Sequence, residues 1–277
     1  MVYSEIVLRY FKEFYRFIKH IFESRKLLLT LSYTDFKEQY SGSYLGIAWA
    51  VIRPALFITV IWFIFGMGFK SRPTDDGTPF VLWLICGFVP WFFFSDAVSK
   101  SMSAIVSNAY LVKKVAFRVS ILPLVKILSA LYIHIVFVFI LLTIFMLYGF
   151  SPTVYWLQIP YFILCTILLV LGLGLLTSSI RVFIKDVGEV IAVVIQFGFW
   201  LTPIFWSLKI IPEEYHSFVQ LNPMFYIIDG YRNSLIHQTW FWETNGLTVY
   251  FLTTATVMFV IGAIVFKRLR PHFGDVL

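Results

Sequence analysis

Charged residues are scarce in this chain: they make up only 13% of its 277 residues, against about 25% in ordinary soluble proteins. The apolar fraction is 60%, and the mean hydropathy is +0.84. No polar stretch between the apolar blocks is long enough to form a soluble core of ordinary size. The composition therefore excludes a soluble protein and predicts one integral membrane domain over residues 1–277.

Groups that carry enzyme or redox chemistry are also few. Cys86 and Cys165 are the only cysteines, and both lie inside apolar runs without metal-ligand spacing. The chain has no GxxxxGK[ST] phosphate-binding loop. We therefore expect no metal site and no cofactor in this chain, and any ATP that drives the protein must be bound by another chain.

Ionisable residues inside the apolar runs are limited to Arg53, Asp96 and His134. Such residues are costly in lipid and often mark function. Their positions in the sequence predict three different depths, so we expect no shared site. We expect His134 to form a hydrogen bond to a neighbouring helix rather than to act in catalysis, and Arg53 to extend toward lipid phosphates.

Long apolar runs predict an all-α membrane protein of about six spans within residues 45–266. The runs are continuously apolar, which favours helices over the alternating strands of a barrel. The predicted spans are Leu45–Phe69, Phe80–Phe94 extended toward Val98, Ile127–Phe150, Ile159–Ile180, Val190–Trp206 and Leu247–Phe266.

The positive charges are distributed unevenly between the two sides of these spans. The side of the termini has 17 Lys and Arg residues and the other side has four, which with Arg53 accounts for all 22. Lys and Arg concentrate in cytoplasmic loops, so both termini are predicted to be cytoplasmic, with residues 267–277 as a tail. Because topology explains the net charge of +7, membrane lipids rather than nucleic acid are the expected partners.

The first 40 residues are predicted to form a cytoplasmic interface region. Val7, Phe11, Phe14 and Ile18 recur at helical spacing, with basic residues on the opposite face. This pattern predicts an amphipathic helix on the membrane surface. It serves either as a topological anchor or as a gate at a channel mouth.

The segment between the fifth and sixth predicted spans is long, apolar and interrupted by Pro212 and Pro223. Phe218–Leu235 is too broken and polar to cross a membrane. Neighbouring spans can shelter such a segment as short re-entrant helices, which is the favoured prediction. The alternative is a helix on the outer membrane surface.

Aromatic residues crowd two of the predicted spans. They are Trp49, Phe57, Trp62, Phe63 and Phe65 in the first span, and Phe197, Phe199, Trp200, Phe205 and Trp206 in the fifth. Aromatic faces can stack on sugar rings, but they also pack cores and anchor helices at membrane interfaces. Both roles stay open from the residues alone.

The inner loop Ser101–Pro123 is predicted to contain a short amphipathic cytoplasmic helix. Apolar residues such as Leu111 and Phe117 alternate there with Lys113, Lys114 and Arg118. A helix of this kind can dock into a groove on a partner, with apolar anchors and a basic rim. The alternative is a loop held against lipid by its positive charge.

Four segments resemble the membrane subunits of type-2 ABC transporters that export polysaccharides, including O-antigen, capsule and teichoic acid exporters. The similar segments run from Asp35 through Gly46 and Trp49 to Pro54, from Asn108 to Pro123, from Arg181 to Trp206 and from Leu221 to Arg232. The chain is most similar to the O-antigen subunits. It departs from the family at Gln39, where a basic residue is more usual.

This resemblance implies a homodimer joined to two copies of a nucleotide-binding ATPase subunit, which binds ATP and Mg. It also implies export of a polysaccharide on an undecaprenyl diphosphate carrier across the bacterial inner membrane. Coupling to the ATPase is expected at Leu111, Lys113, Lys114, Phe117 and Arg118. The substrate channel is expected at Phe57, Trp62, Phe197, Trp200 and Trp206, and the cytoplasmic headgroup entrance at Lys37, Tyr40 and Arg53.

Two other functions compete with polysaccharide export. A drug or lipid exporter of the same architecture would carry small hydrophobic substrates instead. A membrane-embedded glycosyltransferase or acyltransferase would need clustered carboxylates or a histidine near the interface. The scarcity of such groups argues against an enzyme, and no catalytic residue is expected.

Overall fold

The computed structural model describes residues 23–68, 77–113, 119–243 and 246–277. The amphipathic helix expected before residue 23 lies outside the described residues. All regular elements in the described ranges are helical. Five of these helices are long and apolar enough to cross a membrane, and a sixth is apolar but shorter. The predicted all-α membrane architecture is confirmed.

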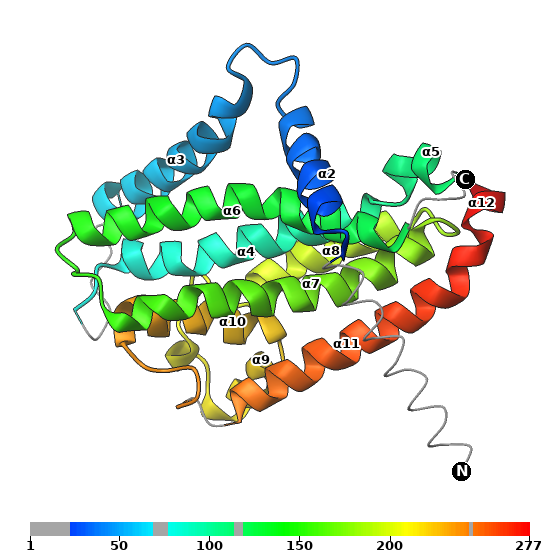
Figure 1. Cartoon of the computed structure of the whole chain (residues 1–277). Helices are drawn as coiled ribbons and strands as arrows, with labels where there is room; N and C mark the ends of the chain where they lie inside the picture. Colours follow the sequence, from blue (N-terminus) through cyan, green and yellow to red (C-terminus); the bar gives the residue numbers. More distant parts are fainter. Residues whose placement is uncertain (1–22, 69–76, 114–118, 244–245) are drawn as a thin grey trace.

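The helices follow one another as labelled in Figure 1. Their bounds are α2 Arg25–Glu38, α3 Trp49–Ile61, α4 Phe80–Ser103, α5 Ala109–Val112, α6 Leu122–Leu147, α7 Ile159–Arg181, α8 Val187–Leu201, α9 His216–Gln220, α10 Pro223–Arg232, α11 Leu247–Leu269 and α12 Phe273–Val276. Two π-helical segments, Trp62–Gly68 and Asn233–His237, extend α3 and α10.

The apolar helix α8 differs from the predicted span Val190–Trp206. It begins at Val187, ends at Leu201 and has 15 residues, a length of about 22 Å against a hydrocarbon core of about 30 Å. The backbone leaves the helix at Thr202, which has φ −88° and ψ 137°. Thr202 precedes Pro203, and the proline ring disfavours a helical conformation at the residue before it. The predicted extension to Trp206 is therefore wrong.

The core is built from α4, α6, α7 and α11. Figure 1 shows α4, α6 and α7 side by side, with α11 crossing α7 obliquely. At that crossing, an added Cβ on Gly262 would lie 2.3 Å from the carbonyl oxygen of Gly172. The two backbones approach closely because neither glycine has a side chain, a frequent device in membrane helix pairs.

The broken segment before the last span folds inward. Pro223 begins α10, and the Asn222 side chain caps it by accepting a hydrogen bond from the amide of Met224. Most of α10 is buried against α4, α7 and α11. This burial agrees with the predicted re-entrant helix and not with a helix lying on the outer surface.

Near the start of the described chain, α2 packs on α6. The ammonium group of Lys126 binds the Asp35 carboxylate, and the Gln39 amide donates to Ser129 Oγ at 2.7 Å. These contacts fix the end of α2, from which the chain turns into α3. In Figure 1, α3 lies over α6. The turn between α2 and α3 projects away from the bundle (Figure 1), while Gln39 at the end of α2 contacts Lys100 near the end of α4.

Candidate functional site

A cavity of about 780 Å³ lies between the end of α2 and helices α3, α4, α6 and α8. Its polar lining includes Gln39, Tyr40, Arg53, Ser95, Asp96, Ser99 and Lys100, and its aromatic lining includes Trp49, Phe57, Phe92, Phe93 and Phe137. Charged groups therefore face ring surfaces across one space. A ligand that carries both an anionic group and rings or an apolar chain fits this combination.

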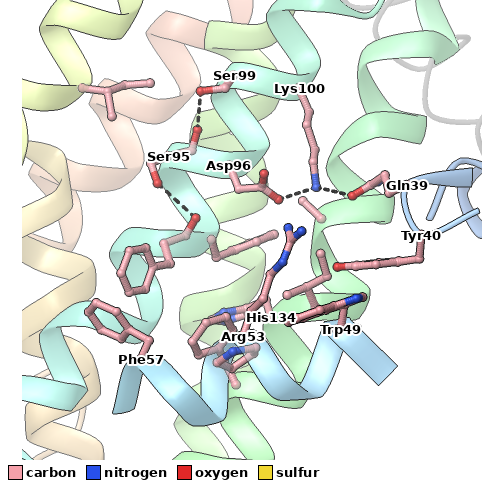
Figure 2. A pocket seen from close by; sticks show the side chains of 18 of the residues that line it. Gln39, Tyr40, Trp49, Arg53, Phe57, Ser95, Asp96, Ser99, Lys100 and His134 are labelled. Atoms are coloured by element: carbon pink, nitrogen blue, oxygen red, sulfur yellow. Dashed lines mark hydrogen bonds and ion pairs between the residues drawn. The ribbon is translucent and has the colours of Figure 1, made fainter. Parts of the chain in front are cut away.

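The polar lining is organised around Lys100, near the end of α4. Its Nζ lies 2.6 Å from Asp96 Oδ2 and 2.9 Å from Gln39 Oε1. Figure 2 shows the ammonium group between these two acceptors. Because Gln39 also donates to Ser129 of α6, residues from three helices hold Lys100 in place.

Arg53 is in a different electrostatic situation. It reaches toward the Lys100–Asp96 pair from α3 (Figure 2), and its guanidinium carbon lies 5.8 Å from the centroid of the Trp49 ring. Among the described residues it forms no hydrogen bond or ion pair. The Arg53 charge is therefore open to an anionic ligand.

Tyr40 adds a neutral donor beside Arg53. Its side chain is buried, and burial raises the pKa of the Tyr40 hydroxyl, although the Arg53 charge acts in the opposite direction. The hydroxyl consequently stays protonated at neutral pH. It can donate a hydrogen bond to an oxygen of a ligand bound near Arg53.

The expectation that Arg53, Asp96 and His134 share no site is wrong, because all three line this cavity. The helices α3 and α4 run in opposite directions, so Arg53 near the start of one lies level with Asp96 in the second half of the other. As expected, His134 bonds to a neighbouring helix: its Nε2 lies 2.9 Å from the Tyr231 hydroxyl of α10.

Two of the three residues predicted for a headgroup entrance lie together in this cavity. Tyr40 and Arg53 line the cavity, whereas Lys37 is exposed on α2 and is not part of its lining. Lys100 takes that place, and sequence reasoning did not single it out. The available signal was its spacing of four residues from Asp96, which puts both side chains on one helix face.

The five predicted channel aromatics differ in their surroundings, and only Phe57 lies in the lining of the cavity. Phe57 lines the cavity and packs against Phe92 and Phe88, with ring centroids 4.7 and 5.1 Å apart. Phe88 lies 4.9 Å from Phe205, which stacks on Trp200 at 5.4 Å. A continuous row of rings thus joins the cavity to the end of α8.

Two other predicted channel residues, Phe197 and Trp200, are 63% and 61% exposed on α8. Trp206 is half-buried and donates from Nε1 to the carbonyl oxygen of Trp200 at 3.1 Å. Trp62 lies apart from the cavity lining, and its Nε1 donates to the Tyr148 hydroxyl at 2.9 Å. Trp62 is thus a contact between α3 and the end of α6, and the cavity does not include it.

A short helix, α5, lies where the coupling helix was predicted. Leu111 is half-buried against the core, Lys113 is exposed, and the neighbouring Tyr110 is 65% exposed. Lys114, Phe117 and Arg118 lie outside the described residues. Within the described part of α5, Tyr110 is thus the large side chain with most of its surface exposed, and Leu111 packs against the bundle.

No group of three His, Cys, Asp or Glu side chains among the described residues could hold a metal ion. Cys86 and Cys165 are both buried and free. The lining of the cavity itself offers charge, hydrogen bonding and ring stacking.

The sequence matches the family described as ABC-2 type transporter over residues 26–236. It is 26% identical to an O-antigen export system permease protein of Klebsiella pneumoniae, over 91% of this chain and 95% of that protein. It is 27% identical to a protein of the same name from Myxococcus xanthus, over 78% and 83%. It is also 21% identical to a polysialic acid transport protein of Escherichia coli, over 91% and 96%. The chain belongs to the ABC-2 type transporter membrane family.

Proposed function

We propose that this chain is the transmembrane subunit of an ATP-driven exporter that moves a lipid-linked polysaccharide from the cytoplasm across the bacterial inner membrane. The proposed cargo is an O-antigen on an undecaprenyl diphosphate carrier. The observation that carries the proposal is the cavity, in which Arg53 and Lys100 face aromatic rings across one space. Cationic groups suit a diphosphate headgroup, and ring faces suit sugars.

Export of a capsule polysaccharide or a teichoic acid is the second candidate. Relatives named for O-antigen export and for polysialic acid transport each match 91% of this chain. Glycan analysis of the exported polymer distinguishes the two candidates.

We propose that the chain has no catalysis of its own and that two copies of a separate nucleotide-binding subunit supply ATP hydrolysis. ATP and Mg would be bound by that partner. The surface of α5 and residues 114–118, which follow it in the sequence, form the proposed docking site. Tyr110 and Lys113 are exposed there, next to Lys114, Phe117 and Arg118, and a groove on the partner would receive these side chains.

We propose that two copies of this chain face each other through α8 and α3. No residue of α8 is buried, and Val190, Val194, Phe197 and Leu201 follow one exposed stripe. On α3, Leu56 and Val60 are more than half exposed. A second copy placed here would enclose a path lined by Phe197 and Trp200, on which sugars would bind weakly enough to slide.

We propose that both termini face the cytoplasm, as the distribution of Lys and Arg predicts. The mouth of the cavity then opens on the cytoplasmic side, because Arg53 lies near the start of α3 and Lys100 near the end of α4. A headgroup would meet Lys37 on the surface of α2 first, and then Tyr40 and Arg53.

The test is to delete the gene and measure cell-surface polysaccharide together with lipid-linked polymer retained inside. We expect loss at the surface with accumulation inside, and rescue by the intact gene. The double variant Lys114→Ala/Phe117→Ala should insert in the membrane but fail to restore export.

Unchanged surface glycan in the deletion strain would contradict the proposal and favour a drug or lipid exporter. Loss of surface glycan without any accumulation would favour an enzyme of polymer assembly. Transfer of a sugar or acyl group by the purified protein would also contradict it.

A further inference from the structure

The ion pair Lys100–Asp96 stands at the polar side of the cavity and is formed within one helix. The side chains of Lys100 and Asp96 are 21% and 42% exposed, and their charged atoms are 2.6 Å apart. Gln39 adds a second acceptor at 2.9 Å. The Lys100 charge is thus already compensated by groups of this chain before any ligand is bound.

Arg53 provides the contrast within the same cavity. It has no counter-ion among the described residues and lies over Trp49. Of the charged side chains in the lining, two are cationic and one is anionic. An arriving anion can bind Arg53 directly, but it can bind Lys100 fully only by displacing the Asp96 carboxylate.

We propose that Asp96 is a built-in competitor for Lys100, which weakens the binding of a diphosphate headgroup in this cavity and allows the headgroup to leave. The inference rests on the proposed function, since it assumes that the cavity receives a diphosphate. A bound diphosphate would take the Lys100 ammonium from Asp96. When the headgroup moves on, Asp96 takes Lys100 back, so the cavity does not retain its cargo.

The physical reason is that transport requires binding that is favourable but weak enough for release. With Arg53 and Lys100 both free, the cavity would present two uncompensated cations at the edge of a low-dielectric region, where charge-assisted hydrogen bonds are strong. A carboxylate on the same helix face offsets one of them. It is always present at the same effective concentration, because it lies one turn away from Lys100.

The experiment measures equilibrium binding to the purified exporter, co-expressed with its ATPase partner. The lipid probe is geranylgeranyl diphosphate, and inorganic pyrophosphate is the probe without a lipid chain. We expect Asp96→Asn to bind geranylgeranyl diphosphate about tenfold more tightly than the wild type, and Lys100→Gln to bind it about tenfold more weakly. Asp275→Asn, which removes an exposed carboxylate on α12, is the matched control and should bind as the wild type does.

A second readout separates competition from a change in folding. In the deletion strain, Asp96→Asn should reach the membrane at normal levels but deliver polysaccharide to the surface more slowly, because the headgroup is retained. Asp96→Glu keeps the carboxylate and should restore both affinity and export rate. This variant shows that the effects of Asp96→Asn come from the lost carboxylate, and Lys100→Gln, which removes the other partner of the pair, keeps the test decisive if Asp96→Asn is poorly folded.

The outcomes distinguish the proposed headgroup role of the cavity from the proposed role of Asp96. If the wild type binds neither probe, the headgroup role of the cavity fails, and with it that part of the proposed function. If the wild type binds a probe but Asp96→Asn binds it no more tightly, the inference about Asp96 is overturned while the cavity keeps its role. If pyrophosphate shows the same tenfold gain, the competition concerns the diphosphate itself, as proposed.

Discussion

The helices α4 and α8 are both strongly apolar, yet α4 is mostly buried within the chain and α8 is not. In α4, 78% of the most apolar stretch of 18 residues is buried, whereas α8 has no buried residue. Composition alone assigns both to a membrane. The difference teaches that α4 finds its cover within this chain, while α8 needs lipid or another protein to cover it.

The same contrast separates two groups of elements. Helices α7 and α10 join α4 in the buried group, because 56% of the most apolar part of the α7 span and eight of the ten residues of α10 are buried. Ring carbons of Phe162 lie within 2.6 Å of the Cβ position of Gly230. The most apolar parts of the spans that contain α3, α6 and α11 are only 22%, 22% and 28% buried. The buried group can serve as the rigid frame, and the exposed group as the moving and binding surface.

The largest expected effect is at the α7–α11 crossing. Gly262→Ala would place a Cβ about 2.3 Å from the carbonyl oxygen of Gly172, and the two backbones would have to separate. We expect a loss of about 3 kcal/mol of stability, measured by thermal unfolding in detergent. Gly274→Ala, with open space around its Cβ position, is the matched control, and equal stability of the two variants would contradict the described crossing.

The next effect concerns Arg232, buried in α10. Its guanidinium lies 3.5 Å from the Trp83 ring centroid and donates to the carbonyl oxygens of Trp83 and Ile204. Arg232→Gln removes these contacts and should cost about 2 kcal/mol. The exposed Arg268→Gln should leave the melting temperature unchanged. A melting temperature for Arg232→Gln equal to that of Arg268→Gln would mean that Arg232 does not hold the frame together.

A smaller effect is expected at Trp62, in the less buried group. Trp62→Phe keeps an aromatic side chain, although a smaller one, and loses the 2.9 Å hydrogen bond to Tyr148. Because Trp62 is 37% exposed, the loss should be about 1 kcal/mol or less. Tyr148→Phe should have the same effect, and the double variant should lose no more than either single variant. Additive losses would show that the two side chains act independently.

The smallest effect on stability is expected at Tyr110. Substitution there should instead change function. Tyr110→Ala in the exposed part of α5 should change stability by no more than about 0.5 kcal/mol. It should nevertheless reduce the coupling of ATP hydrolysis to export, measured as polymer delivered per ATP in membranes. Normal coupling in Tyr110→Ala would remove this residue from the proposed docking surface.

Periodicity and length allowed the long helices to be predicted well. The run Ile159–Ile180 became α7, Ile159–Arg181, because Pro160 favours a helix start and Arg181 ends the apolar run. The second span was predicted too short, since Ser95, Asp96 and Ser99 interrupt its hydropathy although α4 continues to Ser103. The serines bond to backbone carbonyls one turn earlier, so the helix tolerates them.

The candidate site was harder to predict, because it depends on which helices meet. Tyr40 and Arg53 were identified from the motif around the first span. The convergence of Arg53, Asp96 and His134 was missed. The position of a residue within its apolar run does not show which helices pack against each other. Lys37 and Lys100 are both basic and lie near the same end of the bundle, and only the packing of α2 on α6 decides that Lys100 lines the cavity.

The most direct test of whether α8 faces a second copy of this chain is chemical cross-linking of α8 in native membranes. In a background with Cys86→Ala and Cys165→Ala, Phe197→Cys would be treated with a bismaleimide. Leu164→Cys on α7 is the control, because Leu164 and Phe197 are 65% and 63% exposed. We expect a covalent dimer from Phe197→Cys and none from Leu164→Cys. Equal yields from the two positions, or no dimer from Phe197→Cys, would contradict the claim that α8 faces a second copy of this chain.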